Sequence, residues 1–172
     1  MQLPLHPSIV HLPMALAVLM PFVAGGLLLA IWRRWLPPNA VVLATAGQLA
    51  LVVGCLLALR TGEVDEERVE RIVPEAALEL HEHAASTFAW AAGGVLALTV
   101  LLAMPFVLRD ARRFAAVGLA VVLGTLAVLV LGYRTGRAGG ELVYQHGAAA
   151  AFATHGQDAP PPAREHRDHD DR

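Results

Sequence analysis

The chain has few charged residues and a single cysteine. Only 16% of its 172 residues are charged, and Cys55 has no partner for an internal disulfide. Lysine is absent, so all 13 basic residues are arginines, and the formal net charge of −2 does not suggest a nucleic-acid partner. No serine or cysteine lies in a motif typical of a covalent nucleophile, so an enzyme of that kind is not expected.

Apolar residues, by contrast, are abundant. They make up 56% of the chain, and the mean hydropathy is +0.52. They are grouped in four runs, at about 9–32, 40–60, 84–108 and 114–134. Each run is long enough to cross a hydrocarbon core of about 30 Å, and lipid permits only helices there. The sequence therefore predicts an all-α, polytopic membrane four-helix bundle in residues 1–154, and a disordered polar tail in residues 155–172.

The segments between the runs lead to further expectations. Residues 61–83 are acidic with an apolar stripe, which predicts a short helix on the membrane surface with a break at Pro74. Gly62 and Gly136 each follow an apolar run, where glycine commonly ends a helix. Gln48 lies inside the second run and either binds a quinone or substrate, or makes an interhelical hydrogen bond, which is the more common role.

The two halves of the chain resemble each other at an offset near 75 residues. Leu3-x-Leu5-His6 is similar to Leu78-x-Leu80-His81, and Arg60-Thr61-Gly62 is similar to Arg134-Thr135-Gly136. These similarities predict two tandem helical hairpins that cross the membrane in the same direction, as a parallel repeat. His6 and His11 would then lie at the same depth as the histidines that begin the third helix.

Arginine is densest in the two tight connections between helices, which hold Arg33, Arg34, Arg109, Arg112 and Arg113. Cytoplasmic loops carry an excess of arginine, so we expect these connections inside the cell. Both termini and the histidine-bearing segments would then be periplasmic, in a bacterial inner membrane.

Histidines at a membrane boundary are candidate functional residues, and three interpretations are open. In the first, His11 and His83 are axial ligands of heme b, with small residues beside Trp90 making room for the porphyrin and Arg60 or Arg134 holding its propionates. In the second, a Zn, Cu or Fe ion is bound by several side chains; the candidates are His6, His11, His81, His83, His146 and Glu141. In the third, the histidines only form hydrogen bonds with carbonyl groups, with each other and with water.

Three motifs carry a family resemblance. His6-Pro7-x-x-Val10-His11-Leu12-Pro13, His83-Ala84, and Gly139-Gly-Glu-Leu-Val-Tyr-x-His-Gly147 resemble the uncharacterised bacterial membrane family called domain-of-unknown-function family 2231. The resemblance covers Leu5 to about Ala150, and the family's pattern has phenylalanine where this chain has Leu12. Its members are four-helix inner-membrane proteins, some joined to Rieske or cytochrome-type domains, which implies redox partners.

The resemblance favours heme b binding and electron transfer over a metal ion or a structural subunit. We expect no fused redox domain, so the electron partner is expected to be a separate protein of Rieske or cytochrome type. The other expected partners are membrane lipid and a second copy of the chain, and nucleic acid is not expected.

Overall fold

The computed structural model describes residues 5–153, in which every regular element is a helix. The predicted disordered tail lies outside the described residues, and only the backbone is described at residues 5, 67, 68, 152 and 153. The long helices are α2 (His11–Trp32), α3 (Val42–Val69), α4 (Glu75–Leu102) and α6 (Ala111–Tyr144). The short ones are α1 (Leu5–Ile9), the 3-10 helix η1 (Pro38–Val41), α5 (Pro105–Leu108) and α7 (Ala150–Ala153). The prediction of an all-α four-helix fold is confirmed.

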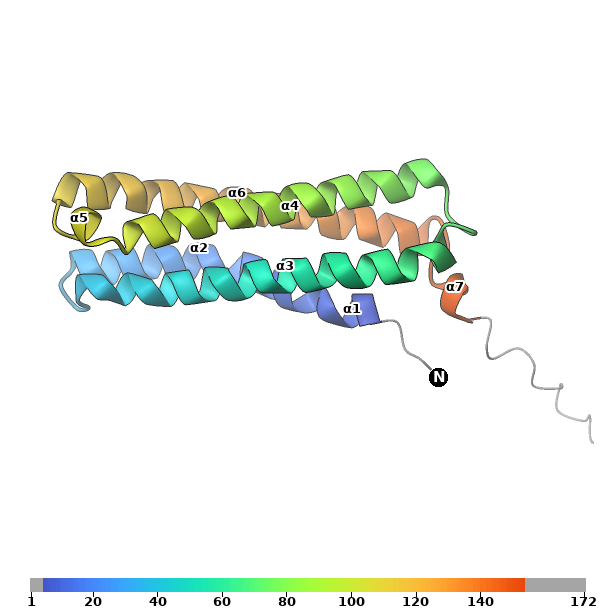
Figure 1. Ribbon diagram of the computed structural model, residues 1–172, viewed down its shortest axis with the longest axis horizontal. Helices are drawn as coiled ribbons and strands as arrows, with labels where there is room; N and C mark the ends of the chain where they lie inside the picture. The colour runs from blue at the N-terminus through green and yellow to red at the C-terminus, as the bar shows by residue number, and fades with distance from the viewer. Residues whose placement is uncertain (1–4, 154–172) are drawn as a thin grey trace, which may run out of the picture.

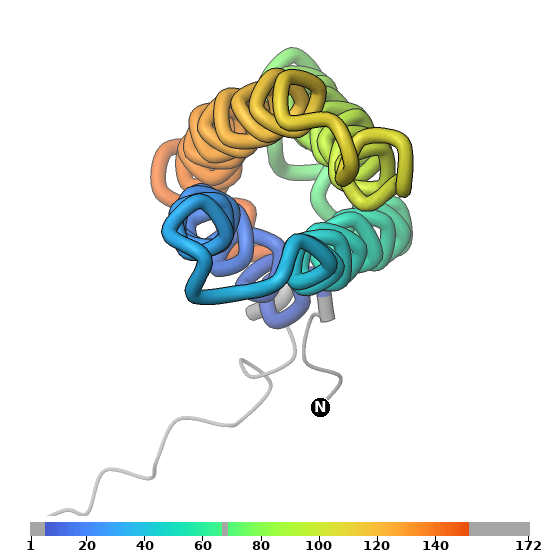
Figure 2. The backbone as a smooth tube through the Cα atoms, turned by 90° about the vertical axis from the view of Figure 1, so that its left-hand side faces the viewer, coloured from blue at the N-terminus to red at the C-terminus, as the bar shows by residue number. Residues whose placement is uncertain are grey.

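The four long helices run alternately up and down and surround a common axis (Figure 1, Figure 2). Helix α2 packs against α3 and α6, and helix α4 packs against the same two, so α2 and α4 occupy opposite corners. All four are long and apolar enough to cross a membrane. The α2–α3 and α4–α6 pairs are arranged as two hairpins would be, while their origin in a repeat stays a prediction.

Two helices continue further than their hydropathy indicates. The prediction of a separate surface helix at residues 61–83 is wrong. Helix α3 continues to Val69, and α4 already begins at Glu75, directly after Pro74. Helix α6 likewise continues through Gly136 to Tyr144. An apolar cluster of Val69, Val73, Leu142 and Ala148 buries the extended ends against one another. Tertiary packing therefore prolongs these helices where a hydropathy pattern ends them.

The third long helix also ends earlier than expected. The prediction placed its end near residue 108, but α4 stops at Leu102 and the short helix α5 follows. Pro105 has no backbone N–H and disfavours helical geometry at the residue before it, so the chain breaks at Met104, whose backbone is extended.

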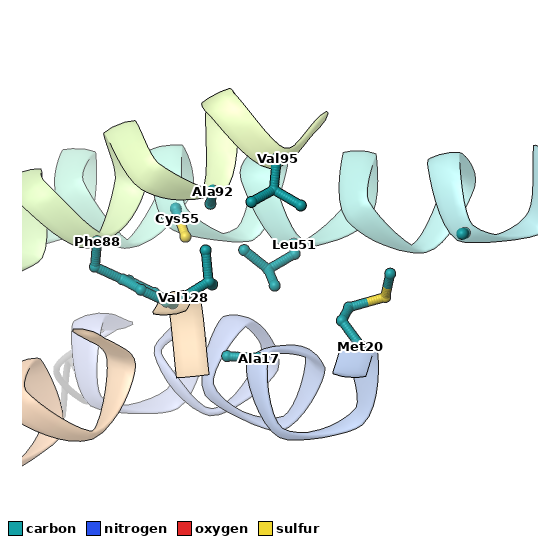
Figure 3. Packing of buried hydrophobic residues seen from close by; sticks show 9 residues of the cluster. Ala17, Met20, Leu51, Cys55, Phe88, Ala92, Val95 and Val128 are labelled. Atoms are coloured by element: carbon teal, nitrogen blue, oxygen red, sulfur yellow. The ribbon is translucent and has the colours of Figure 1, made fainter. Parts of the chain in front are cut away.

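The centre of the bundle is a tightly packed apolar cluster that includes Leu51, Phe88, Ala92, Val95 and Val128 (Figure 3). Glycines bring the helices close together around it. A Cβ atom at Gly54 would lie 3.2 Å from Pro13 Cδ, and one at Gly132 would lie 3.2 Å from Phe88 Cε2. Helices in lipid associate mainly through such close contacts, because lipid is as apolar as the side chains.

Among the side chains that the structure describes, four polar ones are buried between apolar neighbours: Gln48, Thr99, Thr125 and Thr135. The Gln48 Nε2 group donates to the Ala92 carbonyl oxygen at 3.0 Å, so the expected interhelical hydrogen bond is confirmed. Thr99, Thr125 and Thr135 each donate to a carbonyl three or four residues earlier in their own helix. The bundle interior thereby keeps most of its polar groups paired.

The connection after α2 contains a strained residue. Arg34 has a φ of 60°, the left-handed region that favours glycine. This conformation lets the Trp35 N–H donate to the Ala30 carbonyl at 2.8 Å and the Arg34 N–H to the Ile31 carbonyl at 2.9 Å. These are the bonds of a helix-ending Schellman motif, with arginine at the position that glycine usually occupies.

Arg34→Gly should therefore stabilise the protein by about 1 kcal/mol, because glycine removes the left-handed strain of a residue that bears a Cβ. The control is Arg33→Gly, which removes the same charge at a residue with a φ of −74°. Reversible unfolding in detergent should show a gain for the first variant and a loss for the second. Equal effects in both variants would mean that charge, not backbone geometry, determines the change.

Candidate functional site

The five histidines of the described chain are all at the same end of the bundle, which we call the histidine end. There α1 and α7 lie beside the end of α3, the start of α4 and the end of α6 (Figure 1). The opposite end holds the two tight connections with their five arginines, and we call it the arginine end. The sequence-based expectation that the histidine-bearing segments share one end is thus met by the topology.

His6, on α1, is held against the end of α3. Its Nδ1 atom lies 2.9 Å from the Ala58 carbonyl oxygen and 3.4 Å from Thr61 Oγ1. Since a carbonyl only accepts, Nδ1 carries the hydrogen in this bond and Nε2 keeps a lone pair. The ring rests on Gly62, where a Cβ atom would lie 3.3 Å from His6 Cε1. Gly62 therefore provides the space for the ring and does not end the helix as expected.

His81, on α4, is held in a similar way against α6. A Cβ atom at Gly139 would lie 3.0 Å from His81 Cε1, so any other residue here would force the ring to shift. The ring also interacts with the backbone of Thr135. Its Nδ1 atom is buried and has no hydrogen-bond partner among the described residues. An unpartnered buried nitrogen is costly and leaves a donor or acceptor available.

The two rings, one from α1 and one from α4, meet each other. Their centroids are 6.4 Å apart and their planes are nearly perpendicular, at 88°. Each ring lies near the Arg-Thr-Gly segment of its own hairpin, at residues 60–62 for His6 and near residue 135 for His81. We call His6 and His81 the histidine pair, and it is the one close contact between histidine rings in the described chain.

The residues expected to hold a heme are placed differently. His11 and His83 are both exposed, and they belong to α2 and α4, at opposite corners of the bundle. Trp90 is 80% exposed, so it faces outward and does not line the interior. Arg60 and Arg134 are exposed as well. The role of His11 and His83 as axial ligands stays a prediction that this geometry does not support.

The residues expected to bind an ion are only partly brought together. His6 and His81 meet, whereas His11 and His83 are exposed, and Glu141 forms an ion pair with Arg137 at 2.9 Å. His146 is half-buried in the turn after α6, and its N–H donates to the Glu141 carbonyl at 3.3 Å. Across the part of the chain that the structure describes, no group of three or more His, Cys, Asp or Glu side chains is arranged to hold a metal ion.

The last motif, at residues 139–147, has a clear structural role. Its first glycine accommodates the His81 ring, and Leu142 packs against Val69 and Val73. Gly147 has a φ of +70°, which turns the chain so that the Ala148 N–H donates to the Leu142 carbonyl at 3.0 Å. The chain then leads into α7, which packs against α3. The motif therefore both shapes the site and ends the long helix.

Sequence reasoning missed Gly62 and Gly139 as the residues on which the two rings rest, and the Ala58 carbonyl as the partner of His6. The repeated Arg-Thr-Gly segment and the Gly-Gly pair were visible signals for the glycines. The carbonyl had no signal, because any residue type supplies one.

These features define a polytopic four-helix membrane protein with a histidine pair between α1 and α4. A family model described as a predicted membrane protein, DUF2231, matches residues 2–151, and the chain belongs to this family. Neither the search of curated proteins nor the search of solved structures gave a significant match.

Gly139→Ala should displace the His81 ring, because the added Cβ atom would lie 3.0 Å from His81 Cε1. We expect the stability to fall by about 1–3 kcal/mol, as for other overpacked sites. The His81 Cε1–H resonance in the NMR spectrum should shift as well. The control is Gly140→Ala, whose Cβ atom meets nothing within 4 Å. If both variants leave the His81 resonance in place, the ring does not rest on Gly139.

Proposed function

We propose that this protein binds heme b at the histidine end, where His6 and His81 would hold the iron, and takes part in electron transfer at a bacterial inner membrane. The observation that carries the proposal is the histidine pair, in which side chains from the two hairpins meet with 6.4 Å between ring centroids.

The separation of the rings supports a shared metal. A metal–nitrogen bond of about 2.0–2.1 Å puts the centroid of an imidazole roughly 3 Å from the metal, and two such rings on one metal are then about 6 Å apart. The observed distance is close to this value. The buried Nδ1 atom of His81 has no partner among the described residues, and a metal ligand is a role in which such an atom loses its cost. This edge of the ring packs against Gly139, so the ring would have to turn for Nδ1 to bind a metal.

The surroundings of His6 support the same role. Ligating histidines usually donate their other ring N–H to a carbonyl or carboxylate, which fixes the orientation and the tautomer of the ring. The bond from His6 Nδ1 to the Ala58 carbonyl is of this type and leaves Nε2 available. Gly62 and Gly139 keep the backbones of α3 and α6 close to the rings and so restrict their movement.

The number of ligands favours heme over a bare ion. A structural zinc site uses four protein ligands and a catalytic one uses three, whereas heme iron takes at most two from the protein. The histidine pair supplies two, and no larger group of ligating side chains is formed within residues 5–153.

Bound heme would supply one-electron redox chemistry. The two imidazoles would hold the iron. Arg60, which pairs with Glu63 at 3.4 Å, and Arg134 are exposed on α3 and α6, and both carry the positive charge that propionates would need. A soluble redox protein of Rieske or cytochrome type would dock at the same end.

The heme proposal predicts that His6→Ala or His81→Ala abolishes the low-spin visible bands of the dithionite-reduced protein. His11→Ala and His83→Ala are the matched controls, because both histidines are exposed at the same end. We expect the controls to keep the bands, since bis-imidazole ligation needs only the histidine pair. The measurement is an absorption spectrum together with heme and metal analysis.

Other outcomes are equally informative. Loss of the bands only in the His11 and His83 variants would show that the exposed histidines, and not the histidine pair, bind the heme. A stoichiometric Zn, Cu or Fe ion without porphyrin would establish the ion interpretation instead. Protein from a heme-replete and metal-replete host that contains neither would contradict both, and each alanine substitution would then cost only about 1 kcal/mol through lost hydrogen bonds.

The orientation that we propose places the histidine end in the periplasm. The dense arginines of the tight connections support it, because such residues are retained in the cytoplasm. Reporter fusions after Pro38 and Asp110 should be cytoplasmic, and fusions after Glu70 and at the C-terminus periplasmic. The opposite pattern would invert the protein and place the histidine pair in the cytoplasm.

A further inference from the structure

A second feature, distant from the histidine pair, lies at the arginine end. A groove with a volume of about 210 Å³ runs between α2 and α6. Its lining is apolar and consists of Leu28, Trp32, Phe114, Ala115 and Gly118. Trp32 and Ala115 are exposed, whereas Gly118 is buried, so the groove has an open rim and a closed floor.

Glycine creates the floor of this groove. A Cβ atom at Gly118 would lie 3.1 Å from both terminal carbons of Leu28, so any side chain there would fill the space. The groove is smaller than the roughly 300–1,000 Å³ of sites for drug-sized molecules. Its size and lining suit part of one hydrocarbon chain, and it faces outward in the membrane-spanning part of the bundle.

Positive charge lies next to the groove. The Arg33 guanidinium lies 5.4 Å from the centroid of the Trp32 ring, which is part of the lining. Arg112 is three residues before Ala115 on α6, so it lies on the same helix face one turn nearer the membrane surface. A negatively charged group above the groove would be within reach of both.

The surrounding charge has one sign. The two tight connections, residues 33–39 and 103–113, contain five arginines and a single acidic residue, Asp110 (Figure 2 looks onto this end). Asp110 caps α6, and hydrogen bonds from the backbone N–H groups of Arg113 and Arg112 keep the pKa of its carboxyl below the usual value. Asp110 also pairs with Arg113 at 3.5 Å, so it neutralises little of the charge beside the groove.

We propose that this groove binds an anionic phospholipid of the surrounding leaflet, with one acyl chain in the groove and the phosphate between Arg33 and Arg112. Basic pockets between membrane helices are a known form of lipid headgroup recognition. The inference does not depend on the heme proposal, because the two sites are at opposite ends of the bundle.

Native mass spectrometry of the delipidated full chain tests this proposal. Phosphatidylglycerol and phosphatidylcholine with the same acyl chains are titrated in turn. We expect phosphatidylglycerol to bind more tightly, and Arg33→Gln or Arg112→Gln to weaken it about fivefold each, since an arginine near an anionic lipid contributes about 1 kcal/mol. Arg71→Gln, on the exposed connection at the histidine end, should leave its affinity unchanged.

A second pair of variants tests the groove itself. Ala115→Trp should fill the groove and abolish the tight site, while Ala116→Trp, at the next exposed residue of the same helix, should not. Unchanged binding to a folded Ala115→Trp protein would show that the arginines attract lipid without a groove site. Equal affinity for the two lipids, or no effect of the two arginine variants, would overturn the proposed anionic recognition even if Ala115→Trp did not fold.

Discussion

The absence of water from the hydrocarbon core is the constraint on which this structure depends. Each backbone N–H and C=O group must find its partner within its own segment, so the four apolar runs become helices. The same constraint acts on side chains, and the buried Gln48 and threonines bond to backbone carbonyls. Charged groups therefore lie at the two ends of the bundle, and any recognition of polar or charged partners must take place there.

Close helix contact is the second consequence. Hydrophobic burial gives helices no advantage over lipid, so association depends on van der Waals contact, and small residues permit it. In the middle of the bundle Gly54 accommodates Pro13 and Gly132 accommodates Phe88. At the histidine end Gly62 and Gly139 accommodate imidazole rings in the same manner. The histidine pair is thus an extension of the helix packing, and the scaffold that stabilises the bundle also restrains the two rings.

The two ends of the bundle differ in chemistry because different elements form them. Long helices extend past the apolar runs at the histidine end, where an apolar cluster with Val69 and Leu142 supports them and the histidine pair lies between α1 and α4. Short connections form the arginine end, where a groove with Gly118 as its floor lies beside positive charge. The histidine end is the proposed cofactor site, and the arginine end is the proposed lipid site.

The sequence by itself determined the four membrane helices, because a long apolar run has only one stable backbone conformation in lipid. It also predicted that the histidines share one end, since helices of similar length alternate in direction. Tertiary structure decided which histidines meet. His6 and His81 rest on glycines of α3 and α6, whereas His11 and His83 remain outside. On α4 the two residues between His81 and His83 correspond to a rotation of roughly 200° about the helix axis, which separates these outcomes. Packing also decided where α3 and α6 end, because the contacts of Val69 and Leu142 come from segments far apart in the chain.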